Sequence, residues 1–338
     1  MNLELVDKIV NAVLYEGYLL YPYRQTAIKN QQRWNFGVLY PRGYNSDSEA
    51  ASMQTECLVI TSAESRLEVR VRFLQLLQRQ IWVDSPSGAE PVISLEVDGK
   101  IVRSWQEAIE REVSAPVSTV RDLESQPCLR HFSLPAGWES EPLRAASGKV
   151  AGTIVRERES VAGSILLSIT KLSSDLIKLT VKVQNDTEVS PDVNRDTALM
   201  RSTISTHTIL AVENGEFVSQ VDPPDAFRTA IASCQNVGTW PILVGTDDCR
   251  DMMLSSPIIL YDHPQIAPES AGDLFDGTEI DEILSLRIMT LTDEEKREMR
   301  GADERAREIL ERTETLPVEH FMKMHGAVRG LKRMKAHR

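Results

Sequence analysis

The chain has 338 residues, and its 38 Lys and Arg residues against 50 Asp and Glu residues give a formal net charge of −12 at pH 7. Apolar types make up 41% and charged types 26% of the sequence, which is ordinary globular composition and excludes a disordered, collagen-like or disulfide-scaffold protein. The acidic balance argues against general nucleic-acid binding, because that function needs a basic surface to hold the phosphate backbone.

The N-terminus and the cysteines suggest a compartment. Charges at Glu4, Asp7 and Lys8 interrupt any apolar run, so we expect no signal peptide. No segment approaches the roughly 20 apolar residues of a membrane-spanning helix, so no transmembrane segment is expected. The cysteines are Cys57, Cys128, Cys234 and Cys249, and no two form a C-x-x-C pair. We therefore expect reduced structural thiols in a cytoplasmic protein, with no bound metal and no cofactor.

The first 42 residues combine a helical pattern with an aromatic and cationic segment. Apolar residues at helical spacing predict a helix over residues 3–16, which Gly17 could end. Residues 15–42 then mix aromatic rings with Arg and Lys, as partner-binding surfaces often do. The candidate partner-binding residues here are Tyr18, Tyr21, Tyr23, Arg24, Arg33, Trp34, Phe36 and Tyr40. The alternative is an aromatic corner of the core whose cations reach out to water.

The next segment has a strand pattern. Residues 67–73 alternate apolar and charged side chains, and Asp98-Gly99 predicts a hairpin turn. Ser104-Trp-Gln-Glu107 matches a capping box, in which the Ser and Glu side chains each bind a free backbone N–H group, and predicts a short helix to about Val113. Residues 114–148 are rich in Pro and Gly, and we interpret them as an irregular connection with short strand pieces and as a domain boundary.

Short strand patterns dominate the second half. Residues 150–158, 163–170 and 175–184 predict an antiparallel meander, and residues 203–212 predict a further strand that turns at Asn214-Gly215. A helix is expected from Asp222 to about Cys234. Strands are expected at 239–245, 256–262 and 284–288. Thr292-Asp-Glu-Glu295, a second capping box, begins the longest helix, to about Glu314.

These elements predict a mainly β, α+β protein: an antiparallel β-sandwich core with a few flanking helices and a C-terminal surface helix. We divide the chain into residues 1–113 (N-terminal helix, aromatic segment and strands), 114–148 (irregular connection), 149–291 (sandwich), and 292–338 (C-terminal helix and basic tail). A narrow apolar stripe on the last helix suits a surface position.

No strong catalytic motif is present, so candidate chemistry rests on single residues. Asp262 and His263 end an apolar stretch before an acidic loop, where a hydrolase or processing enzyme could place its acid–base groups. The same segment, with Tyr261 and Phe275, could instead dock a partner, be a solvated loop, or bind a hard cation such as calcium through its carboxylates. A third alternative is a calcium- or membrane-binding sandwich that uses the 185–196 loop or the basic C-terminal tail.

Three long stretches carry a resemblance to a known family. They are residues 14–24, residues 33–41 and residues 255–287, the last of which begins Ser255-Ser-Pro-Ile-Ile-Leu-Tyr-Asp262. They resemble an uncharacterised protein family encoded beside high-affinity, actinobacterial-type nickel–iron hydrogenases. The resemblance implies a non-catalytic accessory or assembly protein that contacts the large or small hydrogenase subunit during maturation or complex formation. It supplies no catalytic residues, and the lack of C-x-x-C pairs argues against direct metal delivery.

Overall fold

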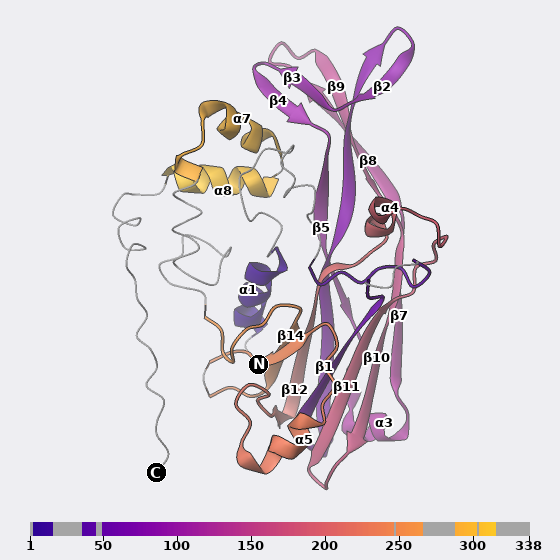
Figure 1. Ribbon diagram of the computed structural model, residues 1–338, viewed down its shortest axis with the longest axis vertical. Helices are drawn as coiled ribbons and strands as arrows, with labels where there is room; N and C mark the ends of the chain where they lie inside the picture. The colour runs from indigo at the N-terminus through magenta and orange to yellow at the C-terminus, as the bar shows by residue number, and fades with distance from the viewer. Residues whose placement is uncertain are drawn as a thin grey trace.

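A computed structural model describes residues 3–15, 36–44, 49–246, 248–265, 288–302 and 304–315, and Figure 1 shows the arrangement of their elements. The strands are β1 (Ser52–Ser85), β2 (Gly88–Val92), β3 (Ser94–Val97), β4 (Lys100–Arg103), β5 (Trp105–Ser114), β6 (Ser118–Thr119), β7 (Cys128–Leu134), β8 (Gly137–Arg144), β9 (Val150–Arg158), β10 (Val161–Lys171), β11 (Leu176–Asn185), β12 (Ile204–Phe217), β13 (Trp240–Leu243) and β14 (Met252–Ser256). The helices are α1 (Leu3–Leu14), α3 (Val120–Ser125), α4 (Arg195–Met200), the 3₁₀ turn η1 (Asp225–Phe227), α5 (Arg228–Ala232), α7 (Asp293–Ala302) and α8 (Glu304–Thr315).

The long strand β1 organises the fold. Its first part, residues 52–60, pairs with β11, and its middle part, residues 66–74, pairs with β12. Its outer part, residues 70–85, pairs in turn with β5, β9 and β2. The register with β12 shifts between Thr61 and Arg66, opposite Asn214, whose φ is +58°. A bulge of this kind bends a strand, so β1 can contribute to both layers of a sandwich.

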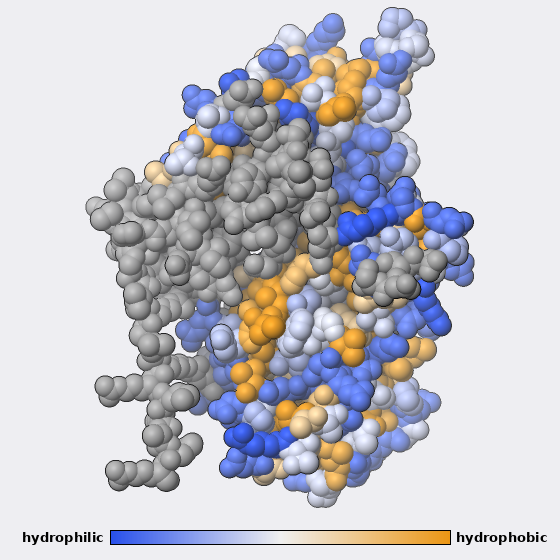
Figure 2. Space-filling model, in the orientation of Figure 1, coloured by the Kyte–Doolittle hydropathy of each residue, from blue (hydrophilic) through white to orange (hydrophobic). Residues whose placement is uncertain are grey.

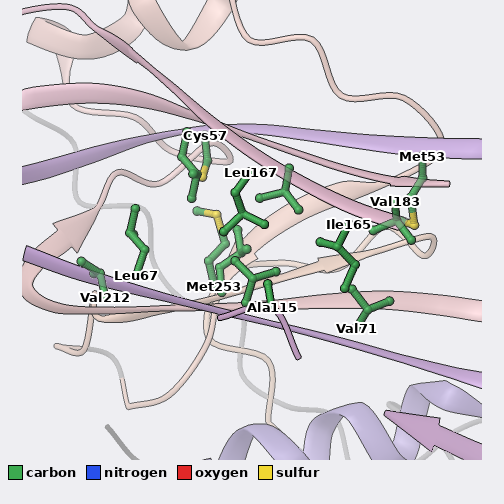
Figure 3. Close-up of a cluster of buried hydrophobic side chains, with 14 of the residues drawn as sticks. Met53, Cys57, Leu67, Val71, Ala115, Ile165, Leu167, Val183, Val212 and Met253 are labelled. Atoms are coloured by element: carbon green, nitrogen blue, oxygen red, sulfur yellow. The ribbon is translucent and has the colours of Figure 1, made fainter. Parts of the chain in front are cut away.

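The sandwich core lies between these layers. One layer consists of β10, β11 and the first part of β1, and the other consists of the middle of β1 with β12 and β14. Figure 3 shows Ile165 and Leu167 of β10 facing Val71, Ala115 and Met253 of the opposite layer. These strands have the period-two pattern that the sequence shows, so their apolar side chains fill one interior. The predicted mainly β sandwich is confirmed.

Helix α1 adds a third layer over β12 and β14. Val6, Ile9 and Val13 of α1 share a buried cluster with Ile209 and Ala211 of β12. The alternate residues of β12, among them Leu210 and Val212, point into the sandwich core. A strand that is covered on both faces needs apolar side chains at consecutive positions. This explains the unbroken apolar run from Ile209 to Val212 in β12. The predicted N-terminal helix is confirmed over residues 3–14.

The two layers converge toward one end of the molecule, at the top of Figure 1. There β9 leaves the layer of its continuation β10 and pairs with β1, and β8 pairs with β9. The hairpin of β3 and β4 also lies at this end, beside α7, and its turn at Asp98 and Gly99 has φ values of +50° and +76°. The Asp98-Gly99 hairpin is confirmed, because both turn positions adopt the left-handed conformation that these residues tolerate.

Several predictions from the middle of the chain are wrong. Residues 105–114 form β5 rather than a helix, because ten consecutive residues pair with β1. The short strand pieces expected in residues 114–148 are present as β6, β7 and β8, but with α3 they form regular structure in the large sheet rather than an irregular connection. The predicted meander is wrong at β9, which pairs with β1 and β8 instead of β10.

Other differences concern the second half. No hairpin occurs at Asn214-Gly215, since β12 continues to Phe217. The helix expected from Asp222 is only η1 followed by the short α5, and the strand expected at 256–262 is displaced to β14. Thr292 does bind Glu295 as a capping box at the start of α7, but α7 and α8 replace one long helix. Residues 284–287 and the basic tail lie outside the described residues, while Ile288 is helical.

Among the described residues, no helix combines the length and the apolar character that crossing a bilayer requires.

Candidate functional site

The segment that follows β14 displays large apolar side chains. Ile259 is 73% exposed and Tyr261 is 82% exposed. Figure 2 shows apolar surface on this face in the region that Figure 1 labels β14, bordered by hydrophilic residues. Large apolar side chains that lie close together in sequence and face water are typical of surfaces that bind a partner. We call residues 257–263 the display segment.

Hydrogen bonds hold the display segment at both ends. At its start, Ile258 N donates to Ser256 Oγ over 3.1 Å. At its end, His263 N donates to Leu243 O over 2.8 Å, and Leu243 N donates to Asp262 Oδ1 over 2.8 Å. The segment is therefore attached to β13 and β14 although its apolar side chains face solvent.

Asp262 has a structural role in this arrangement. Its second oxygen accepts a hydrogen bond from Ser219 Oγ, and the same hydroxyl oxygen accepts from Asp222 N over 2.9 Å. The carboxylate therefore connects the end of β12, strand β13 and the display segment. Both of its oxygens already have partners within the fold, and a carboxylate in that position is poorly placed to act as a general base.

His263 lies next to Asp262 but does not form a catalytic pair with it. Its backbone is left-handed, with φ +53°, and its Nδ1 is buried without a hydrogen-bond partner in the described part of the chain. A base acts through a hydrogen bond to a nucleophile or to an orienting carboxylate. The described residues bring neither to His263, so the geometry does not favour the hydrolase alternative.

The aromatic candidates of the N-terminal segment fall into two groups. Tyr40 is buried, stacks on Tyr44 with ring centroids 5.2 Å apart, and has the Arg195 guanidinium 6.0 Å from its ring centroid. Burial raises the pKa of Tyr40 to about 12. Tyr40 therefore belongs to the core, which corrects its assignment as a partner-binding residue. Phe36 is half-buried, and its carbonyl accepts from Ser205 N.

The remaining candidates of that set, and the second aromatic residue of the 257–282 segment, lie outside the described residues: Tyr18, Tyr21, Tyr23, Arg24, Arg33, Trp34 and Phe275.

The 185–196 loop uses its polar groups to support the fold. The buried side chain of Asn185 donates to Leu39 O and Arg201 O, and Asp186 accepts from Ser164 Oγ over 2.6 Å. Asn194 caps α4 by accepting from Thr197 N. Nowhere in the described ranges do three or more His, Cys, Asp or Glu side chains gather as a metal site would require. The four cysteines are free, and burial raises the pKa of the Cys57 thiol.

A charged row that sequence reasoning missed crosses four strands at the convergent end. Arg79 of β1 donates to Glu107 Oε1 of β5 over 2.9 Å, and Arg156 of β9 donates to Glu107 Oε2 over 2.8 Å. Arg156 also donates to Glu141 of β8 over 3.1 Å. The side chains of Arg79 and Glu107 are largely buried, 8% and 15% exposed. The predicted helix at 104–113 hid this row, because it placed Glu107 at a helix end instead of beside Arg79.

A second polar cluster lies between α1 and the outer face of β1. Arg70 and Arg72 of β1 form ion pairs with Asp7 of α1 and with Glu112 of β5. His207 of β12 is paired with Arg72 in the sheet register and is fully buried. The pKa of His207 is lowered to about 4, mainly by burial and to a smaller extent by the charge of Arg72. Because the charged side chains of this cluster pair with one another, we interpret it as a contact that holds α1 on the sheet.

Neither a protein-family model nor a curated protein matches the chain.

Proposed function

We propose that this chain is a non-catalytic assembly protein that binds a partner protein through the display segment. The observation that carries the proposal is the combination of exposure and attachment: Ile259 and Tyr261 face solvent on a backbone that Asp262 connects to Leu243. Exposure alone is common on protein surfaces, whereas an attached aromatic side chain is preorganised for binding.

The physical advantage of this arrangement is entropic. A tyrosine has two side-chain torsions, a large apolar ring and one hydroxyl group, so it buries much area while losing little conformational freedom. Because the backbone is already ordered by its bonds to β13 and β14, binding need not order the loop. Interface residues that are costly to replace are enriched in such aromatic anchors.

We further propose that the partner is the large or small subunit of a nickel–iron hydrogenase. The support is that residues 255–287, one of the stretches that resemble the hydrogenase-associated family, include Ser256, Tyr261 and Asp262. Ser256 and Asp262, which help to hold the segment, and the displayed Tyr261 thus belong to the stretch that carries the resemblance.

Co-purification tests the proposal. The tagged full chain is expressed in a cell that makes such a hydrogenase, beside the double variant Ile259→Ser/Tyr261→Ser. We expect the unaltered chain to retain a hydrogenase subunit and the double variant to retain at least tenfold less. Trp138→Ser is the matched control, since Trp138 is 70% exposed but lies on β8.

Unchanged recovery with the double variant would refute binding through the display segment. Recovery of no hydrogenase subunit by the unaltered chain, under mild conditions, would refute the proposed partner.

A further inference from the structure

The sandwich interior changes from apolar to cationic toward the convergent end. On β1, the inward residues Val71 and Phe73 belong to the apolar core, and Gln75 follows two positions later. On β5, Val113 is paired with Val71 and Arg111 is paired with Phe73. An arginine therefore stands beside the last aromatic side chain of the core, where an isolated charge is costly unless something compensates it.

Gln75 fixes the position of Arg111. Gln75 is fully buried, and its carbonyl oxygen accepts from Arg111 Nε over 2.9 Å. Its amide nitrogen donates to Glu159 O over 2.8 Å, so Gln75 connects β5 with the chain between β9 and β10. One edge of the Arg111 guanidinium is thus satisfied by a neutral group. Within the described residues, Arg111 has no carboxylate partner.

Arg158, at the end of β9, lies on the same face of the sheet as Gln75, because Arg156 is paired with Arg79. It precedes Glu159, whose carbonyl Gln75 binds. In the part of the chain that the structure describes, its one carboxylate contact is Glu139 at 3.4 Å, and the Glu139 side chain is 73% exposed, so water screens that pair strongly. Arg158 Nε is buried and has no hydrogen-bond partner among the described residues.

Gly137 makes room beside the Arg158 guanidinium. A Cβ atom at position 137 would lie 2.7 Å from Arg158 Nη2, so any side chain there would displace the guanidinium. Burial lowers the pKa of Arg111, and the charge of Arg158 lowers it further, which is the effect of a like charge nearby. The strand registers pair Arg111 with Phe73 and Arg158 with Gly137, so both arginines project from the face of the sheet that carries Gln75.

The neighbouring charged row shows what a compensated arrangement looks like. There Arg79 and Arg156 share the two oxygens of Glu107, and Glu141 adds a second carboxylate. Among the described residues, Arg111 and Arg158 together have a single carboxylate partner, the exposed Glu139. The pair therefore has one positive charge more than its described partners can balance.

We infer that Arg111 and Arg158, positioned by Gln75 and Gly137, bind one oxyanion group, the phosphate or carboxylate of a small molecule. A guanidinium presents its N–H groups in a planar fork that matches two oxygens of such a group. An anion held between the two forks would supply the missing charge and a partner for Arg158 Nε. This site is separate from the display segment, and it does not depend on the proposed assembly function.

Thermal unfolding and calorimetric titration of the purified full chain test the inference. The buffer contains chloride only, and either inorganic phosphate or succinate is added at constant ionic strength. We expect one of the two anions to raise Tm with a saturating concentration dependence. Arg111→Gln and Arg158→Gln should each weaken that binding at least tenfold. Arg121→Gln is the control, because Arg121 is exposed and pairs with the exposed Glu64.

A second measurement separates binding from folding. Without added anion, Arg111→Gln should have a Tm equal to or higher than that of the unaltered chain, since it removes repulsion between guanidinium groups. A lowered Tm together with an unchanged response to both anions would show a structural role and overturn the inference. The absence of any anion response in the unaltered chain would also overturn it, as would a response in both Arg→Gln variants that equals the response of the unaltered chain. Which anion binds identifies the ligand class.

Discussion

Arg79 of β1 and Glu107 of β5 lie diagonally across a strand pair, with Arg79 Nη1 2.9 Å from Glu107 Oε1. The second oxygen of Glu107 accepts from Arg156 of β9 over 2.8 Å. One carboxylate thus joins three strands at the end where the two sandwich layers meet. Because the Arg79 and Glu107 side chains are largely buried, removal of either one leaves the other charge uncompensated in a place that water reaches poorly, which costs stability.

Replacement of Glu107 should therefore destabilise the fold. We expect Glu107→Gln to lower the free energy of unfolding by about 3 kcal/mol, because two guanidinium groups lose their shared negative charge in a poorly hydrated site. Urea unfolding followed by far-UV circular dichroism measures the change. The matched control is Glu64→Gln, which removes an exposed pair with Arg121 and should cost less than about 1 kcal/mol. Equal effects of the two substitutions would contradict the buried role of Glu107.

His207 should make stability depend on pH. Its Nδ1 lies 2.7 Å from Ser205 O, so the buried neutral ring carries its proton on Nδ1. Its pKa is lowered from 6.5 to about 4 in the folded chain, so the unfolded chain binds the proton first as the pH falls. The contribution is fully present above pH 6.5 and is lost progressively down to about pH 4. The loss amounts to roughly 3 kcal/mol, since one pKa unit corresponds to about 1.4 kcal/mol.

Comparison with a neutral variant isolates this effect. We expect His207→Gln to have a smaller slope of unfolding free energy against pH between 6.5 and 4 than the unaltered chain. Denaturant titrations at several pH values in that range measure both slopes. The exposed His131 provides the control, and His131→Gln should leave the slope unchanged. Identical slopes for the unaltered chain and His207→Gln would refute the assignment.

Asp262 should matter for attachment of the display segment. Asp262→Ala removes the acceptor of Leu243 N and of Ser219 Oγ, and we expect a loss of about 2 kcal/mol of stability. Asp262→Asn keeps an oxygen for Leu243 N, and the Ser219 hydroxyl can reverse to accept from the amide, so most of the stability should return. Thermal and urea unfolding measure both variants. Equal losses of stability in Asp262→Ala and Asp262→Asn would contradict this role of the carboxylate oxygens.

Gly163 should tolerate no side chain. A Cβ atom there would lie 2.5 Å from Phe132 Cζ and 2.6 Å from Gln184 O, and the latter is backbone that cannot turn away. We expect Gly163→Ala to destabilise by roughly 2 kcal/mol or more, through overpacking between β7, β10 and β11. Ser168→Ala, farther along β10, is the control and should cost less than about 1 kcal/mol. Equal unfolding midpoints for the two variants would show that the strands can separate to admit the methyl group.

The sequence predicted the elements whose local pattern agrees with their environment. The alternation at residues 67–73, the Asp98-Gly99 turn and the Thr292–Glu295 capping box all recur in the structure. The capping box at Ser104 failed, although its residues fit the motif equally well. Ser104 Oγ donates to Val92 O and accepts from Ile81 N, and Glu107 binds two arginines of other strands. The groups that Ser104 and Glu107 bind instead lie more than ten residues away from them in sequence.

The candidate sites show the same division. The sequence singled out Tyr261 and Asp262, but it did not distinguish a displayed ring from an attached carboxylate. It also assigned Tyr40 to a surface, whereas stacking on Tyr44 places it in the core. Arg111 and Arg158 gave no signal, because nothing in their own segments predicts that Gln75 lies between them.

The amino-acid sequence by itself determined the β-rich class, the sandwich and the N-terminal helix, because side-chain periodicity follows from backbone geometry within a few residues. The tertiary structure alone decided where β1 bends, which strands its outer part binds, and which charges meet at the convergent end. Those outcomes depend on contacts between segments that are distant in sequence. There, the burial of charged groups and their pairing with opposite charges decide which arrangement has the lowest free energy.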